Sequence, residues 1–183
     1  MLKAKKGRLL ISEPSLNDNV FFKSVVLLTH HNDEESIGLI LNHPTKINLN
    51  EILNNIPLSD LPIYLGGPVE KQSLHFIHTL GSIIPNSKQI IDGIYFGGDF
   101  DIVIQLMHDK KITKNEIRFF VGYSGWEAEQ LNNEIRDDAW IVQTAKNELC
   151  MNYSTPKLWS DIIKTKKMEY AIWANMPKDP SLN

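Results

Sequence analysis

The segments Ser24–His30 (SVVLLTH) and Ser36–Asn42 (SIGLILN) decide the fold, because each is a nearly unbroken apolar run of strand length. Runs of this kind are typical of β-strands that are buried on both faces of a sheet. The polar residues His31–Glu35 between them indicate a hairpin. The sequence therefore predicts two adjacent, fully covered strands near the start of the chain.

More strands than helices are predicted around this hairpin, and the two kinds of element do not alternate strictly. This order favours an α+β fold with a mostly antiparallel or mixed sheet and flanking helices over a doubly wound one. The other predicted strands are Arg8–Glu13, Ile63–Leu65, Ser73–Thr79, Gln89–Phe96 (bent at Gly93), Ile117–Tyr123 and Trp140–Thr144. The predicted helices are Asn48–Asn54, one capped by Asp99 with Ile102, Val103, Leu106 and Met107 as its apolar stripe, Trp126–Ile135 and Ser154–Lys166.

Length and composition indicate one domain. With 183 residues and no linker, repeat or low-complexity stretch, residues 1–183 are expected to fold as a unit. Residues 1–6 form a basic arm and residues 175–183 are expected to be a loose tail. No apolar stretch approaches the roughly 18 residues of a membrane span, so we expect a cytoplasmic protein without a membrane partner.

Charge and cysteine usage restrict the chemistry. The net charge of −3 argues mildly against a protein that binds DNA mainly through phosphates. The single cysteine, Cys150, excludes a disulfide within the chain and a cysteine-based zinc site. Basic residues gather near both ends and an acidic stretch, Glu127–Asp138, lies between them. We interpret these as solvated faces, with an oppositely charged partner as the alternative.

The segment Gly122-Tyr123-Ser124-Gly125-Trp126 is the one place where a catalytic serine is suggested. It lies between a predicted strand and a predicted helix, which is the setting of a nucleophile elbow. Trp126 stands where that motif needs a small residue, and no histidine follows His108. We therefore predict a tight strand-to-helix turn with Trp126 in the core, and no catalytic residues.

Histidine and glycine patterns predict neither a metal site nor a cofactor. His75 and His78 are three apart on a predicted strand and should point to opposite faces. Neither a dinucleotide fingerprint nor a P-loop occurs. Gly66-Gly67-Pro68-Val69 is expected to form a sharp corner, or alternatively the floor of a ligand site.

No motif in the sequence supports direct, sequence-specific binding to DNA. Asp99–Arg118 begins like a helix–turn–helix, but its second half, from Ile117, is strand-like. A helix-turn-helix needs a second helix at that point to enter the major groove.

Four blocks in order resemble the YqgE/AlgH family. They are Gly7-x-Leu9-Leu10-Ile11-Ser12-x-Pro14 with Ser24–Leu28; His31 with Gly38–Asn42-x-Pro44; Gly66–Val69; and Gly122–Trp126 with Gln130, Leu131 and Glu134. The resemblance extends from about Gly7 to Trp173, nearly the whole chain. Ser124 replaces the alanine that is more usual in the fourth block, and Glu127 and Glu129 replace small residues.

The resemblance implies an α+β fold with a bent, partly barrel-like sheet. It also implies the label of transcriptional regulator, which some members carry, and it brings no established catalytic residues or cofactor.

The leading hypothesis is a non-catalytic binding or regulatory protein that acts on a protein partner or a small ligand. Glycine, proline and aromatic turns shape surfaces that can hold ligands. The expected surface comprises Asn42, His43, Pro44, Gly66, Gly67, Pro68, Gly122, Tyr123, Ser124, Gly125 and Trp126. The alternatives are a hydrolase-type enzyme and a direct DNA-binding regulator that contacts phosphates through its basic ends.

Overall fold

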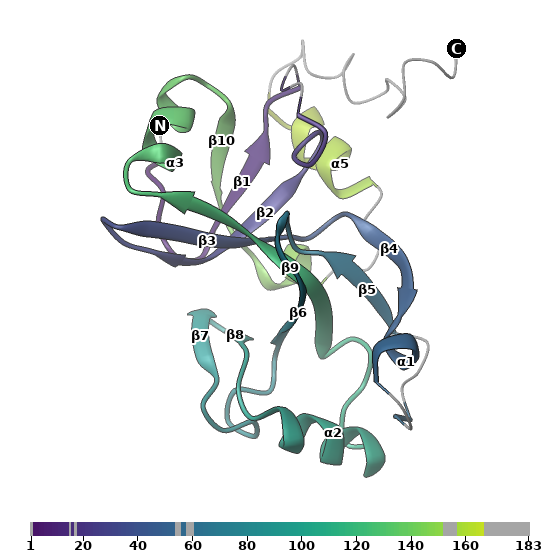
Figure 1. Ribbon diagram of the computed structural model, residues 1–183. Coiled ribbons are helices and arrows are strands. Elements are labelled where there is room, and N and C mark those ends of the chain that lie inside the picture. The colour runs from purple at the N-terminus through teal and green to yellow at the C-terminus, as the bar shows by residue number, and fades with distance from the viewer. Residues whose placement is uncertain are drawn as a thin grey trace.

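A ten-stranded sheet with short helices on its faces makes up the described part of the chain, which comprises residues 2–14, 16, 18–53, 56–57, 61–151 and 157–166 of the computed structural model. The main strand order is β10-β1-β2-β3-β9-β6-β8-β7, and β4 and β5 join it beside β9 (Figure 1). The strands are β1 Arg8–Ser12, β2 Val25–His31, β3 Glu35–Ile40, β4 Pro44–Asn48, β5 Pro62–Leu65, β6 Val69–His78, β7 Lys88–Ile91, β8 Ile94–Phe96, β9 Ile117–Glu127 and β10 Trp140–Thr144. The helices are α1 Leu49–Ile52, α2 Phe100–His108, α3 Gln130–Arg136, α4 Asn147–Cys150 and α5 Leu158–Lys164.

The predicted hairpin is confirmed. β2 and β3 pair antiparallel, with Leu27 opposite Leu39. Successive side chains enter different cores: Leu27 joins the cluster that contains α5, and Val26 joins the cluster that contains α3. Both faces are covered, which explains why the two runs carry no polar–apolar alternation.

Strand β9 connects the two halves of the sheet (Figure 1). Its last part, Ser124–Glu127, pairs with β3. Its first part pairs with β5 on one edge, in parallel, and with β6 on the other edge, antiparallel. All other pairings are antiparallel, so the described sheet is mostly antiparallel, as predicted.

The sheet curls until its edge strand β7 meets the residues just before β1. The Lys6 ammonium donates a hydrogen bond to the carbonyl of Gln89 on β7 (3.1 Å). A Cβ atom on Gly7 would lie only 2.5 Å from the Ile91 side chain. The curled half-barrel encloses an apolar cluster that α4 and α5 help to close. This shape agrees with the expectation drawn from the family resemblance.

Two of the predicted helices begin as their capping residues indicate. The Asp99 carboxylate accepts hydrogen bonds from the main-chain N–H groups of Asp101 and Ile102 at the start of α2. At α1, the Glu51 side chain accepts from the N–H of Asn48 (2.8 Å). The capping residue expected at Ser154 lies outside the described residues.

Two predictions are wrong for local reasons. Gln89–Phe96 is not one bent strand, because Asp92-Gly93 forms a two-residue turn between β7 and β8, with Gly93 at φ +72°. Gly122–Trp126 is not a strand-to-helix turn, because β9 continues through it to Glu127 and α3 begins only at Gln130. The short elements β4 and α4 were not predicted.

Candidate functional site

Two glycine-containing segments of the sequence, Gly66–Val69 and Gly122–Trp126, meet where the chain crosses β9. Between β5 and β6, which occupy opposite edges of β9, residues 66–68 must pass over that strand. A Cβ atom on Gly66 would lie 2.2 Å from the carbonyl oxygen of Gly122, and one on Gly67 would lie 2.2 Å from the main chain of Tyr123. Main chain therefore packs directly on main chain, as the expected corner at Gly66–Val69 requires.

Ser124 is fully buried within this crossing. Its hydroxyl donates a hydrogen bond to the carbonyl of Gly66 (3.0 Å). A nucleophile elbow needs a serine exposed on a sharp turn. Ser124 instead lies in the middle of a strand and ties the two glycine blocks together.

Trp126 belongs to a cluster that we call the tryptophan–glutamate cluster, composed of Phe21, Trp126, Glu134 and Trp140. One carboxylate oxygen of Glu134 accepts hydrogen bonds from the indole N–H groups of Trp126 (2.8 Å) and Trp140 (2.7 Å). Phe21 packs on both indoles at centroid distances of 5.9 and 5.4 Å. Trp126 is in the core, as predicted, and its N–H group is already used.

Asn42–Pro44 lies beside β5 and close to Gly66. The Asn42 amide accepts a hydrogen bond from the N–H of Val25 (2.8 Å) and donates one to the carbonyl of Lys23 (2.7 Å). The His43 carbonyl accepts from the N–H of Leu65. Pro44 begins β4. This segment fastens β4 and β5 to the central hairpin.

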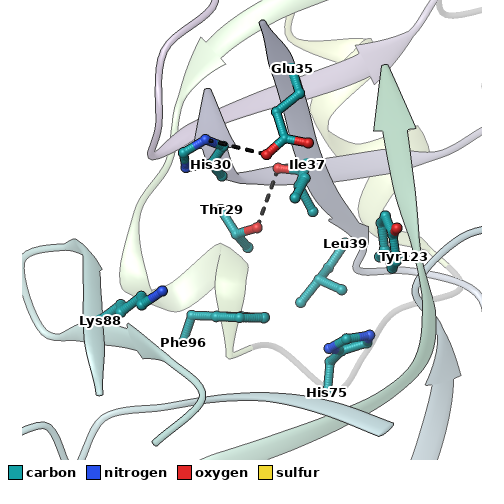
Figure 2. Close-up of a pocket in the computed structure, with 9 residues that line it drawn as sticks. All are labelled: Thr29, His30, Glu35, Ile37, Leu39, His75, Lys88, Phe96 and Tyr123. Carbon is teal, nitrogen blue, oxygen red and sulfur yellow. Dashed lines mark hydrogen bonds and ion pairs between the residues drawn. The ribbon is translucent and has the colours of Figure 1, made fainter. Parts of the chain in front are cut away.

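A cavity of about 430 Å³ opens on the concave side of the sheet, and Tyr123 is the only member of the expected surface that lines it. Figure 2 shows side chains from six strands directed toward it. They are Thr29 and His30 from β2, Glu35, Ile37 and Leu39 from β3, His75 from β6, Lys88 from β7, Phe96 from β8 and Tyr123 from β9.

Three rings form one wall of this cavity. Phe96 stacks on His75 with centroids 6.0 Å apart, and Tyr123 meets the other side of His75 edge-on at 5.8 Å. Burial lowers the pKa of His75, although the nearby Glu70 carboxylate acts in the opposite direction. The ring of His75 is therefore neutral at pH 7 and behaves as part of an aromatic surface.

The charged groups lie at the rim. His30 Nε2 is 3.8 Å from Glu35 Oε1, and both side chains are about half exposed. The Thr29 hydroxyl donates to the Ile37 carbonyl (3.2 Å). Lys88 lies on the β7 side of the cavity (Figure 2), and no ion pair of Lys88 is found within the described residues.

A second hollow adjoins the cavity and shares Glu35, Ile37 and Tyr123 with it. Gly125 and Trp126 of the expected surface line it, together with Glu34, Ser36, Val69, Glu127 and Gln130. The expected residues are thus divided: Tyr123, Gly125 and Trp126 reach hollows, and the buried Asn42, Gly66, Gly67 and Ser124 hold the main-chain crossing and the hairpin.

His75 and His78 lie on opposite faces of β6, as predicted. His78 is fully buried, its Nε2 lies 2.9 Å from the Gly97 carbonyl and its Nδ1 accepts from the N–H of Leu80 (3.1 Å). Across the described ranges, no group of three His, Cys, Asp or Glu side chains is arranged to hold a metal ion. Nor does any helix among the described residues have the length and apolar character needed to cross a membrane.

Comparison with known proteins identifies the family. The family described as AlgH-like matches residues 9–171. The chain belongs to the AlgH-like family. It is 40% identical to a UPF0301 protein of Bacteroides fragilis over 97% of this chain and 91% of that protein. It is 37% identical to a UPF0301 protein of Chlorobaculum parvum over 100% of this chain and 97% of that protein.

Solved structures confirm the AlgH-like fold. The solution structure of the AlgH protein from Pseudomonas aeruginosa matches with a TM-score of 0.73 at 24% identity, covering 98% of this chain and 100% of that one. The crystal structure of protein DIP2367 from Corynebacterium diphtheriae matches with a TM-score of 0.76 at 20% identity, covering 96% and 94%.

One turn that was not predicted explains why the sequence did not bring Lys88 and Phe96 to this cavity. Lys88 and Phe96 are paired across the β7–β8 hairpin, and a single strand over Gln89–Phe96 would have placed them far apart. The signal was present: Asp-Gly between short apolar runs is a strong hairpin signal.

Proposed function

We propose that this AlgH-like protein is a non-catalytic binding protein that holds a small molecule in the cavity between the β2–β3 hairpin and strands β6–β8. The observation that carries the proposal is the cavity itself. Its volume of about 430 Å³ falls within the range of ligand pockets, which is about 300–1,000 Å³.

The composition of the cavity supports the same conclusion. Ligand pockets are mostly apolar, with a few polar groups that fix orientation. Here Ile37, Leu39 and Phe96 form apolar walls, whereas His30, Glu35 and Lys88 lie at the rim. The lining side chains come from rigid strands, so the site is built before a ligand arrives.

The binding role is favoured over the hydrolase alternative by the position of Ser124. Its hydroxyl is inaccessible and already donates to the Gly66 carbonyl. Activation as a nucleophile would need a base within hydrogen-bond reach of that hydroxyl and an exposed path for substrate.

A fragment screen by ligand-observed NMR tests the proposal. We expect several fragments to bind wild-type protein and to lose binding in Ile37→Trp, where the larger ring fills the cavity. Ile47→Trp is the matched control, because Ile47 is on β4, is 40% exposed and is not among the lining residues. The proposal fails if no fragment binds, or if the same fragments bind equally well to a folded Ile37→Trp variant.

A further inference from the structure

The walls of the cavity suit a flat ring. Phe96, His75 and Tyr123 present aromatic surface from three different strands. Ile37 of β3 lies across the cavity from Phe96 (Figure 2), and the buried Leu39 belongs to the apolar cluster on which Phe96 and Tyr123 pack. Aromatic groups prefer offset stacking or edge-to-face contact with other rings, at centroid distances of about 4.5–7 Å. A planar guest can meet both arrangements here, on Phe96 and on Tyr123.

The rim adds a positive charge beside that aromatic wall. Lys88 is the cross-strand partner of Phe96 in the β7–β8 hairpin, so its side chain extends from the strand next to that ring. Within the described residues no carboxylate pairs with Lys88. The Lys6 ammonium, bound to the carbonyl of Gln89, adds a second positive charge to β7.

The negative charge at the rim, the Glu35 carboxylate, lies on a different side of the cavity from Lys88. Glu35 faces the imidazole of His30 at 3.8 Å, on the β2–β3 side of the cavity (Figure 2). An anionic guest can place its charge beside the Lys88 ammonium on the β7 side, away from the Glu35 carboxylate on the β2–β3 side (Figure 2). Charge complementarity therefore favours an anion on the β7 side.

We propose that the ligand of the cavity is an aromatic carboxylate. Its ring lies between the Phe96–His75–Tyr123 wall and Ile37, and its carboxylate binds the ammonium of Lys88. This assignment rests on the proposed binding function and adds the chemical class of the ligand.

Three matched probes test the assignment by titration into isotope-labelled protein: indole-3-acetate, its neutral amide and tryptamine. We expect the carboxylate to bind about tenfold more tightly than the amide, the effect of one charge-assisted hydrogen bond at a partly exposed site. Shifts should centre on the amides of Leu39, Lys88 and Phe96. Equal or tighter binding of the amide or the amine in this cavity would overturn the assignment and leave the binding function standing.

Variants of Lys88 test whether its positive charge causes the preference for the carboxylate probe. Lys88→Met should remove the preference for the carboxylate over the amide, and Lys88→Arg should keep most of it. Lys114→Met is the control, since Lys114 is exposed and is not among the residues that line the cavity. An undiminished preference in Lys88→Met refutes the role of this residue. If none of the three probes binds wild-type protein, the aromatic-carboxylate assignment is wrong, and the fragment screen decides separately whether the cavity binds anything.

Discussion

At the scale of single residues, Glu134 is the side chain on which most other groups in the tryptophan–glutamate cluster depend. It accepts from two indole N–H groups and from the Gln130 amide (2.9 Å). Trp126 and Trp140 are almost completely buried. A buried donor left without an acceptor costs about 1–3 kcal/mol. One carboxylate thus lets two large aromatic residues occupy the same core.

Glu134→Ala should lower the free energy of unfolding by about 2–4 kcal/mol, because two indole donors lose their acceptor. Glu134→Gln keeps an acceptor oxygen in the same place and should cost less than half as much. Urea unfolding followed by tryptophan fluorescence measures both. Equal losses in the two variants would show that the indoles do not depend on this acceptor.

At the scale of elements, the crossing of residues 66–68 over β9 explains the glycines of two separate blocks. A Cβ atom on Gly66 would lie 2.2 Å from the carbonyl oxygen of Gly122, and one on Gly122 would lie 2.7 Å from the carbonyl oxygens of Gly67 and Val69; Gly122 also has φ +66°. Gly125 lies on the same strand but has no atom closer than 3.5 Å to such a Cβ. The crossing requires glycine only where one main chain approaches the other closely, and Gly125 is not such a position.

Gly66→Ala should therefore destabilise the protein by about 3 kcal/mol or more, since the opposing atom is main chain and cannot turn away. Gly125→Ala should change stability by less than about 1 kcal/mol, because its contacts are ordinary. Thermal unfolding of both purified variants is the measurement. A folded Gly66→Ala variant with wild-type stability would contradict the packing of β5–β6 on β9.

The sequence predicted those elements whose signals are local. Continuous apolar runs predicted β2 and β3, and the capping residue Asp99 predicted the start of α2. Both signals lie within or beside the element that they predict. The crossing and the cavity were not predictable in the same way. Gly66 meets Gly122, and Lys88 comes to line the same cavity as Thr29 and Leu39, only after the sheet has curled. Those contacts depend on strand order, which no local pattern contains.

At the scale of the whole molecule, stability should depend on pH through histidines held neutral by burial. Burial lowers the pKa of His78, with the Gly97 carbonyl acting in the opposite direction, and burial likewise lowers the pKa of His75. The two histidines therefore affect the pH dependence of stability in the same direction, although they lie on opposite faces of β6. The unfolded chain, in which these pKa values return to about 6.5, binds protons more readily than the folded one below neutral pH.

The sign of the effect follows from this difference. The stabilising contribution is complete above about pH 6.5, falls as the pH drops below it, and stops falling below the folded-state pKa. Each histidine can contribute at most about 1.4 kcal/mol per pH unit within that window. Urea unfolding at pH 7.5, 6.5 and 5.5 should show the decline, and it should be shallower in His78→Gln. His108→Gln is the control, because His108 is exposed at the end of α2 and should leave the slope unchanged. An equally steep decline in His78→Gln would mean that other groups govern the acid response.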